Sequence, residues 1–333
     1  MSDGFLPRVL FVIPGEAEGS SMVFARRQAA ALRGTGVEVE SFFLRSRTSP
    51  VMLFQEWRRF LAVAEAFRPD VVHGHFGTMT AFFTVLAGRG WPVVITYRGS
   101  DLNLVPSARG PRAWAGRLLS QAAALGATRI VCVSGALRDR LWWRRGIATV
   151  LPSGVDLDRF RPRPRELARR ELGWAPGGRV VLFNAGVDER NKRLDLAEAA
   201  VGRARGELAG VHLEVLRGGV APERMPLFMN AADCLLITSD AEGSPSVVQE
   251  ALASNLPIVS VAVGDVVERM EGVPGTRIAR RDPDSLARAL IELLEQPRRS
   301  GGRAKAQECS AARVAAELAR IYRQAALRQA RAA

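Results

Sequence analysis

Two glutamates stand eight positions apart in the stretch AEGSPSVVQEALAS, and carboxylates are good hydrogen-bond acceptors for hydroxyl groups. Glu242 precedes a Gly-Ser-Pro turn, and Glu250 falls in the second turn of a helix predicted at 245–254. Such a pair arises often by chance, so the residues around it decide whether it matters. The spacing suits one elongated ligand whose hydroxyl groups are bound at both ends.

The turn between the two glutamates suits an anion. Ser244 is expected to cap the helix, with Pro245 as its first residue. The amides of Ser246 and Val247 would then lack partners within the helix and would point at a phosphate. The whole string therefore indicates a site for two sugars bridged by a diphosphate.

A second group of residues follows the predicted strand at 179–184. Arg190, Lys192 and Arg193 cluster at the start of a helix predicted at 192–204, where cations oppose the helix dipole unless an anion binds between them. Lys192 is one of two lysines among 47 basic residues, which favours a specific use as a compact charge for a phosphate. The alternative is a solvated basic turn.

The N-terminal half has its own candidate loop after its first predicted strand, with the sequence PGEAEGSS. Gly15 and Gly19 would let the backbone approach a ligand, and Ser20 or Ser21 would cap the following helix. The loop has neither the dinucleotide-binding nor the Walker pattern. An ordinary strand-to-helix turn is the equal alternative.

Polar residues also follow the third and fourth predicted strands. Two of the chain's three histidines occur in HGHFGT, and we expect His73 to be structural and His75 to face the ligand. No third residue has a spacing that would complete a zinc site with them. Arg98 and Asp101 flank the next Gly-Ser turn as cleft residues, with a local salt bridge as the alternative.

Short apolar runs alternate with longer amphipathic ones, which predicts a doubly wound parallel α/β sheet in each half of the chain. Strands are predicted at 8–13, 37–43, 70–73, 92–96, 129–133, 179–184, 211–216, 233–237, 257–261 and 276–279. Helices are predicted at 21–33, 52–67, 78–88, 111–125, 135–144, 192–204, 222–231, 245–254, 264–270, 283–295 and 303–330.

The chain's 333 residues exceed what one hydrophobic core usually serves, so two domains are expected. The stretch LPSGVDLDRFRPRPRE, rich in proline, glycine and aspartate, separates domains at 1–152 and 153–310. The helical segment at 311–333 would pack back toward the first domain. Two Rossmann-like domains would then face each other across a cleft, with ligands beyond the carboxyl ends of the strands.

The composition indicates a soluble cytoplasmic protein with anionic partners. No apolar run is long enough to span a bilayer, and the first strand is too short for a signal-peptide core. The three cysteines show no metal or disulfide spacing. Residues 1–150 hold 19 arginines and 10 acidic residues, a large share of the net charge of +13. Nucleic-acid binding would need arginine interleaved with exposed aromatic residues on one element or a recognised module, but tyrosine is nearly absent and no such module appears.

These motifs together resemble the family-four retaining glycosyltransferases of GT-B fold. The stretch from Glu242 to Glu250 matches the family's E-x7-E motif, and the strand with its Gly-Asp turn follows as in the family. SGVDLDRF, NAGVDERNKRLDL and DVVHGHFG match the interdomain, phosphate-binding and histidine segments. The likeness covers nearly the whole chain and is densest at 179–270.

The resemblance implies a role for each candidate residue. His75, Glu242 and Lys192 would be catalytic, with His75 and Glu242 beside the transferred sugar. The diphosphate would be neutralised by Lys192 and Arg190, since Val187 occupies the nearest position to the family's usual arginine. The remaining donor contacts would come from Glu250 at the ribose and from the backbone of Gly15, Gly243, Ser244, Ser246 and Val247.

The resemblance also implies the type of reaction. The co-substrate would be a UDP or GDP sugar, no cofactor or metal would be required, and the leaving phosphate would take the acceptor's proton. The product would belong to cell-envelope polysaccharide or glycolipid synthesis. The rivals are a non-catalytic nucleotide-sugar-binding protein and an epimerase of the same fold.

The acceptor, a glycan or a lipid-linked sugar, is expected in the more basic N-terminal half. Leu53, Trp57 and Phe60 fall near one face of the predicted helix at 52–67, and Trp142 and Trp143 form a second aromatic group next to arginines. These residues favour either peripheral contact with an anionic membrane at its inner face or core packing with an arginine rim.

Overall fold

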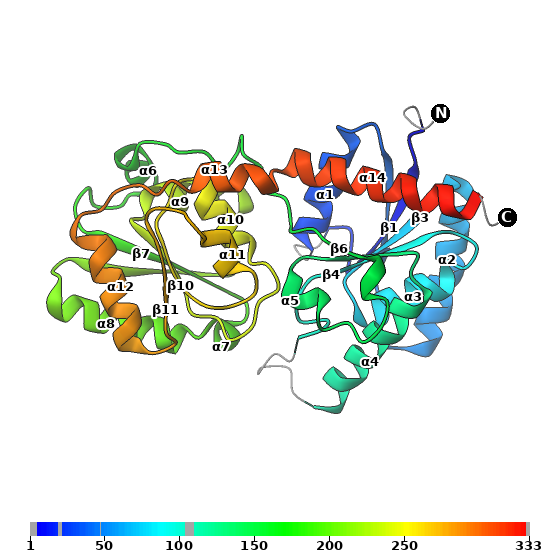
Figure 1. The fold of residues 1–333 in the computed structure, drawn as a ribbon, viewed down its shortest axis with the longest axis horizontal. Coiled ribbons are helices and arrows are strands. Elements are labelled where there is room, and N and C mark those ends of the chain that lie inside the picture. The colour runs from blue at the N-terminus through cyan, green and yellow to red at the C-terminus, as the bar shows by residue number, and fades with distance from the viewer. Residues whose placement is uncertain (1–4, 19–21, 47, 104–109, 331–333) are drawn as a thin grey trace. The chain divides into compact units, whose positions relative to one another are not determined.

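The computed structural model describes residues 5–18, 22–46, 48–103 and 110–330, and these form two compact units. Unit 1 contains the described residues up to Gly154 together with the C-terminal segment from Ala311, and unit 2 contains Val155–Ser310 (Figure 1). The first boundary therefore lies two residues after the expected position at 152. Each unit is a parallel α/β sheet with helices, which confirms the predicted fold class.

Unit 1 has a six-stranded parallel sheet in the order β2-β1-β3-β4-β5-β6. Its strands are β1 Arg8–Pro14, β2 Glu38–Leu44, β3 Val71–His75, β4 Val93–Tyr97, β5 Arg129–Cys132 and β6 Ala148–Val150. Val9 pairs with Val39 on one side and Val71 on the other, so β1 is an interior strand of the sheet. Its apolar run Val9–Ile13 is fully buried, as expected for a parallel strand covered on both faces. The short edge strand β6 was not predicted.

The helices of unit 1 are α1 Val23–Arg33, α2 Pro50–Phe67, α3 Thr78–Ala87, α4 Pro111–Gly126, α5 Gly135–Arg138 and α14 Ala311–Ala330. Helix α14 packs against α1, β3 and β4, and it places Leu318 and Tyr322 in one core with Val9 and Phe11 (Figure 1). The helix predicted at 135–144 is too long, because α5 ends at Arg138.

Unit 2 has a five-stranded parallel sheet in the order β11-β10-β9-β7-β8. Its strands are β7 Arg179–Gly186, β8 Val211–Arg217, β9 Cys234–Ile237, β10 Ile258–Val261 and β11 Thr276–Ala279. Its helices are α6 Arg165–Leu172, α7 Glu189–Lys192, α8 Leu194–Glu207, α9 Met225–Ala231, α10 Ser246–Ala253, α11 Val266–Met270, α12 Pro283–Glu295 and α13 Gly302–Ala306. Helix α6 was not predicted, because its arginine-rich sequence resembles a linker.

Two predicted helices of the C-terminal half are interrupted. The helix at 192–204 breaks at Arg193, whose φ of 57° is left-handed and separates α7 from α8. The helix at 303–330 breaks at Ser310, where the backbone becomes extended and forms a parallel bridge with Val155. The backbone amide of Val155 donates to the carbonyl of Cys309 at 2.9 Å. This bridge joins segments far apart in the chain, which helical periodicity does not report.

Both sheets reverse strand order beside their first strand. In unit 1 the chain runs from β1 to β2 on one side and then to β3 on the other, and in unit 2 it runs from β7 to β8 and then to β9. Ligands of open α/β sheets bind at the carboxyl ends of the strands at this reversal. The segments that follow β1, β3, β7 and β9 are therefore where the candidate residues should gather.

Candidate functional site

At the strand reversal of unit 2, Lys192 and Glu242 are in contact. Lys192 ends the short helix that follows β7, and Glu242 lies in the loop that follows β9. The Nζ atom of Lys192 lies 2.5 Å from Oε1 of Glu242, with 26% and 14% of the two side chains exposed. A half-buried ion pair is thus formed by residues 50 positions apart, at the edge of the sheet where a ligand is expected.

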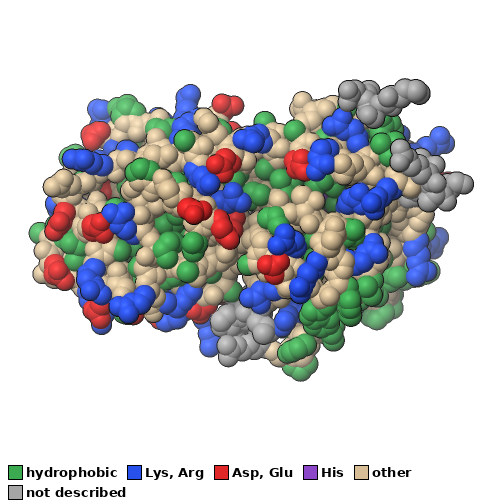
Figure 2. Space-filling model, viewed as in Figure 1, with side chains coloured by type: hydrophobic (Ala, Val, Ile, Leu, Met, Phe, Trp, Pro, Cys, Tyr) green, Lys and Arg blue, Asp and Glu red, His purple; other side chains and the backbone are tan. Residues whose placement is uncertain are grey.

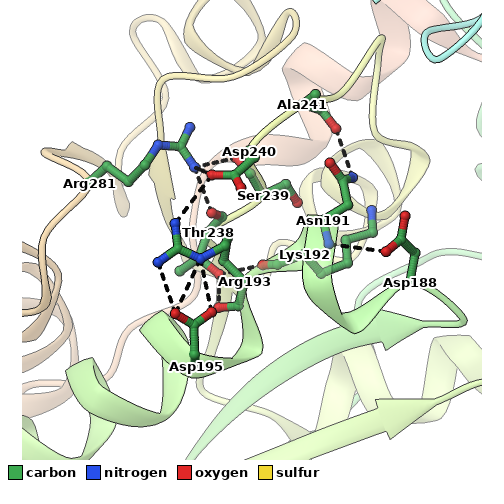
Figure 3. Close-up of polar contacts among 10 residues, drawn as sticks. All are labelled: Asp188, Asn191, Lys192, Arg193, Asp195, Thr238, Ser239, Asp240, Ala241 and Arg281. Atoms are coloured by element: carbon green, nitrogen blue, oxygen red, sulfur yellow. Dashed lines mark hydrogen bonds and ion pairs between the residues drawn. The ribbon is translucent and has the colours of Figure 1, made fainter. Parts of the chain in front are cut away.

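The backbone segments that carry this pair are bonded to each other (Figure 3). The amide of Asp240 donates to the carbonyl of Asn191 at 2.8 Å, and Nδ2 of Asn191 donates to the carbonyl of Ala241 at 3.0 Å. The Thr238 hydroxyl donates to the carbonyl of Lys192 at 2.7 Å. These bonds run in both directions between the two loops, so Lys192 and Glu242 are held in register with each other.

The other cations of this segment are arranged differently from the expectation. Arg190 and Lys192 lie in the single-turn helix α7, which directly precedes α8, and Arg193 is the N-cap residue of α8. The side chain of Arg190 is exposed, and the structure shows no ion pair for it among the described residues. Arg193 is paired with Asp195 at 2.8 Å and with Asp240 at 3.4 Å.

Arg281 is part of the same network, and sequence reasoning missed it. Its Nη1 atom donates to the carbonyls of Thr238 at 2.8 Å and Ser239 at 2.5 Å, and it lies 3.2 Å from Asp240 (Figure 3). It supports the loop that leads to Glu242. Its position directly after β11 was the available signal, since residues that follow parallel strands meet at one edge of the sheet.

Ser244 does not cap the following helix as predicted. Its hydroxyl donates to Oδ2 of Asp265 at 2.8 Å, and Pro245 occupies the N-cap position of α10. The loop after β10 also approaches closely at Gly264, which has a φ of 58° and where a Cβ would lie 2.8 Å from the carbonyl oxygen of Gly243. The loop between Glu242 and α10 is therefore held by the β10 loop, and its serine is already occupied.

The start of α10 still offers backbone donors. The amides of Ser246 and Val247 donate to no acceptor that the structure shows within the described part of the chain. Glu250 lies further along α10 and is 7% exposed. Glu242, the free amides and the nearly buried Glu250 thus follow one another along a single loop and helix, and Lys192 contacts the first of them from the loop after β7.

The loop after β1 in unit 1 requires glycine at one position. Gly15 has a φ of 115°, and its amide donates to the carbonyl of Leu44 on the neighbouring strand at 3.0 Å. Arg26 of α1 donates to the carbonyl of Glu16 at 2.7 Å and so ties the loop to the helix. Helix α1 has Met22 at its N-cap position, without a side-chain cap. The candidates Gly19, Ser20 and Ser21 lie outside the described residues.

The two histidines of β3 have different surroundings, although both are fully buried. His73 is bonded at both ring nitrogens, to the hydroxyls of Tyr322 at 2.6 Å and Thr96 at 2.7 Å. His75 has Nδ1 3.2 Å from Nη2 of Arg98, and its Nε2 atom is buried without a partner among the described residues. Burial lowers the pKa of both histidines well below 6.5, and the charge of Arg98 lowers it further. His73 is the structural member of the pair.

Arg98 and Asp101 do not form the local salt bridge that was the alternative for this turn. The carboxylate of Asp101 accepts the backbone amides of Gly77 at 2.9 Å, Arg98 at 2.9 Å and Gly99 at 2.7 Å. It thereby joins the loop after β3 to the loop after β4. Thr78, three residues after His75, has a φ of 57°, which is strained for a β-branched residue, and its amide donates to the hydroxyl of Ser120 at 2.7 Å.

Comparison with known proteins agrees with this geometry. The model described as Glycosyltransferase Family 4 matches residues 17–159, and the model described as Glycosyl transferases group 1 matches residues 179–296. The solved structure of Anabaena HepE in complex with UDP and glucose has a TM-score of 0.69 at 16% identity, over 95% of this chain and 99% of that one.

Two curated relatives match at higher identity over shorter stretches. D-inositol 3-phosphate glycosyltransferase 2 of Catenulispora acidiphila is 31% identical over 46% of this chain and 43% of its own. The putative teichuronic acid biosynthesis glycosyltransferase TuaC of Bacillus subtilis is 29% identical over 60% and 54%. The chain spans about half the length of these curated relatives.

Two parallel-sheet units, each with candidate residues directly after the strands at its reversal, define a doubly wound, Rossmann-like α/β protein. The two matched family models identify the family within this fold class: the chain belongs to the family-four glycosyltransferases of GT-B fold. The resemblance inferred from the sequence motifs is thereby confirmed at the level of family and fold.

Proposed function

We propose that the protein is a retaining glycosyltransferase that moves a sugar from a nucleoside-diphosphate sugar to a hydroxyl acceptor. The Lys192–Glu242 contact at the strand reversal of unit 2 is the observation that carries the proposal. It places one cation and one carboxylate directly before the free amides at the start of α10. A phosphate is negatively charged and can therefore bind both the Lys192 ammonium group and the free amides. A sugar has hydroxyl groups that can donate hydrogen bonds to the Glu242 carboxylate.

The cationic and N–H groups of the site bind the diphosphate in this proposal, and the carboxylates bind the hydroxyl groups. Lys192 and the amides of Ser246 and Val247 stabilise the negative charge that grows on the leaving diphosphate. Glu242 accepts hydroxyls of the donor sugar, and Glu250 accepts those of the ribose. Catalysis of this kind is positioning together with charge stabilisation. It needs no protein nucleophile, because the acceptor hydroxyl attacks the sugar on the face that the diphosphate leaves, and no protein base, because the leaving phosphate takes the acceptor's proton.

UDP is the preferred nucleotide in this proposal, with GDP as the alternative. HepE, which shares the fold, was solved in complex with UDP and glucose, and this supports UDP. One relative is named for D-inositol 3-phosphate and another for teichuronic acid biosynthesis. The second name supports our proposal of an acceptor that belongs to cell-envelope polysaccharide or glycolipid synthesis.

Thermal-shift titration in EDTA with UDP, GDP, ADP and CMP is the first test of the donor site. We expect one nucleoside diphosphate to stabilise the protein by about 2.7 kcal/mol at 100 times its dissociation constant, and Glu250→Gln to abolish this shift. A shift that appears only when Mg²⁺ is restored would contradict metal independence. Stabilisation without sugar transfer to any acceptor would favour the non-catalytic alternative.

Unit 1 exposes large apolar side chains on helices α2 and α4, which flank α3. Figure 2 shows hydrophobic side chains gathered on this side of unit 1, at the lower right. Phe60 is buried and Leu53 is partly buried, so core packing was the correct interpretation for these two. The exposed residues are Val51, Met52, Phe54, Trp57 and Leu61 on α2, Trp114, Leu118 and Leu125 on α4, and the nearby Trp142 and Trp143.

This surface supports peripheral contact with an anionic membrane that presents a lipid-linked acceptor. Arg58 and Arg112 are exposed on the same helices, and aromatic residues with adjacent arginines suit the headgroup region of a bilayer. Among the described helices, none has the length and apolar composition that crossing a bilayer requires.

Co-sedimentation with vesicles tests the membrane contact. We expect the protein to bind phosphatidylglycerol vesicles at physiological salt, to bind neutral phosphatidylcholine vesicles weakly, and to lose binding in Phe54→Ser/Trp114→Ser, which removes two exposed apolar anchors. Absence of binding to anionic vesicles would contradict the proposal. A dimer in solution that this double variant dissociates would show that the surface is a protein interface instead.

A further inference from the structure

The contact between Arg98 and His75 determines more about the histidine than its position. A guanidinium group carries N–H donors and no acceptor, so any hydrogen bond from Arg98 must be accepted by the ring nitrogen. The nitrogen facing Nη2 of Arg98, at 3.2 Å, is Nδ1. A neutral imidazole has one acceptor nitrogen and one N–H, and with Nδ1 as the acceptor the proton must be on Nε2.

Arg98 is itself held in place from several elements of unit 1. Its Nη1 atom donates to the hydroxyl of Ser153 at 3.1 Å, and its Nη2 atom donates to Oε1 of Gln28 on α1 at 3.2 Å. Its guanidinium group lies over the ring of Phe24, 4.1 Å from the centroid. No ion pair of this guanidinium with a carboxylate is found among the described residues. The side chain is therefore oriented by neutral groups that leave one N–H directed at His75.

Two buried nitrogens of this arrangement, Nε of Arg98 and Nε2 of His75, have no hydrogen-bond partner among the described residues. On the histidine, the unpaired group is the Nε2–H. Buried donors in folded proteins are nearly always satisfied, because leaving one unpaired costs about 1–3 kcal/mol. His73, by contrast, has both of its nitrogens occupied. A partner for His75 from outside the chain, such as a substrate oxygen, would remove this cost.

We infer that Arg98 is a positioning residue that keeps His75 in the Nε2–H tautomer, so that His75 donates a hydrogen bond to a substrate oxygen and does not act as a base there. The catalytic half of this inference rests on the proposed function, whereas the tautomer does not. The charged and titratable groups around His75 agree with it. His73 on the same strand and Arg98 on the next loop both disfavour a second proton, and the Asp101 carboxylate is occupied by backbone amides.

Histidine side-chain NMR tests the tautomer without reference to activity. The chain has three histidines, and labelling them with ¹⁵N gives a spectrum in which His75 is assigned by its absence in His75→Gln. We expect wild-type His75 to show the Nε2–H pattern and to remain neutral as the pH falls through about 6.5, where an ordinary histidine titrates. In Arg98→Met, both tautomers should appear, and Arg98→Lys should restore part of the wild-type pattern.

Two results would overturn this part of the inference. One is a wild-type His75 that carries its proton on Nδ1. The other is a tautomer that Arg98→Met leaves unchanged while the variant is folded by circular dichroism. If Arg98→Met does not fold, the wild-type spectrum alone decides the question.

Activity tests the catalytic half with a matched pair of variants. The carboxamide nitrogen of glutamine reaches about as far as Nε2 of histidine, and that of asparagine reaches about as far as Nδ1. We expect His75→Asn to lose about 100-fold or more in kcat, the usual effect of removing one positioned donor, and His75→Gln to lose about tenfold. Arg98→Met should lower kcat by about 10- to 100-fold with a much smaller change in the donor KM, and Arg98→Lys should recover part of it.

The failures of the two proposals are distinguishable. Equal activities of His75→Asn and His75→Gln, or unchanged kcat in a folded Arg98→Met whose tautomer is lost, would overturn the positioning role while sugar transfer stands. No transfer by the wild-type protein with any donor would overturn the proposed function, and the NMR result would still decide the tautomer.

Discussion

Replacing Lys192 by methionine is expected to lower kcat/KM for sugar transfer by about 10²- to 10³-fold, which corresponds to about 2.7–4 kcal/mol of transition-state stabilisation. Lys192 is in contact with Glu242, and the loop that follows Glu242 leads to the free amides of α10. Its ammonium group would face the diphosphate as charge develops there. Lys192→Arg should retain only part of the activity, because a planar fork does not reproduce a compact charge.

The chain provides a matched control for this substitution. Lys305 of α13, the second lysine of the chain, pairs with Glu308 at 3.1 Å, so Lys305→Met removes the same charge outside the candidate site. We expect that control to keep wild-type kcat and KM. The measurement is steady-state transfer with the donor identified by thermal shift. Retention of activity within about threefold in Lys192→Met would contradict the role given to it.

The effect of Lys192 on activity must be distinguished from that of Glu242 in the same experiment. Lys192→Met leaves the Glu242 carboxylate half-buried without this partner, so part of any loss could come from that carboxylate repelling the diphosphate. The double variant Lys192→Met/Glu242→Gln removes this repulsion. If Lys192 acts on the phosphate directly, the double variant should remain as impaired as Lys192→Met, and recovery of activity would show an effect through Glu242.

Replacing Arg169 by methionine is expected to destabilise unit 2 by about 1.5–3 kcal/mol, because it removes the buried one of the two arginines that pair with the Asp233 carboxylate and leaves only Arg165, at 2.5 Å. Arg169 on α6 is 1% exposed, and its Nη2 atom lies 2.6 Å from Oδ2 of Asp233. It also donates to the carbonyls of Ala231 at 2.9 Å and Pro176 at 2.8 Å. Asp233 further accepts the amide of Val180, so the ion pair joins α6 to β7 and β9.

The neighbouring Arg170 is exposed on the same helix, so Arg170→Met is the matched control and should change stability by less than about 0.5 kcal/mol. Urea unfolding can be followed through Trp174, the only one of the six tryptophans outside residues 1–150. It packs against Phe228 in unit 2. A loss below about 1 kcal/mol in Arg169→Met would show that the buried pair is replaceable by apolar packing.

The helix boundaries show which features local sequence determines. Helix α12 begins and ends where predicted, at Pro283 and Glu295, because Asp282 caps it through the amide of Ser285 at 2.8 Å and proline follows at the first position. Ser244 has the same local pattern before Pro245, yet its hydroxyl bonds to Asp265. A capping motif is predictable only while no residue distant in the chain competes for the same side chain.

The sequence by itself determined the fold class, the family and the segments that hold the site. Buried parallel strands are continuous apolar runs, and site residues follow directly after them, so both are readable from short windows such as that around Val9–Ile13, whose residues are all fully buried. These features depend on neighbours along the chain.

Tertiary structure alone decided the pairings that give the site its chemistry. The Lys192–Glu242 contact joins residues 50 positions apart, and the Arg98–His75 contact that orients a buried proton joins residues 23 apart. The entry of Arg281 into the site and the break at Ser310 likewise depend on distant partners. Packing between strands and helices determines which partner a side chain has and where the backbone becomes left-handed or extended. Neither can be predicted from the local sequence.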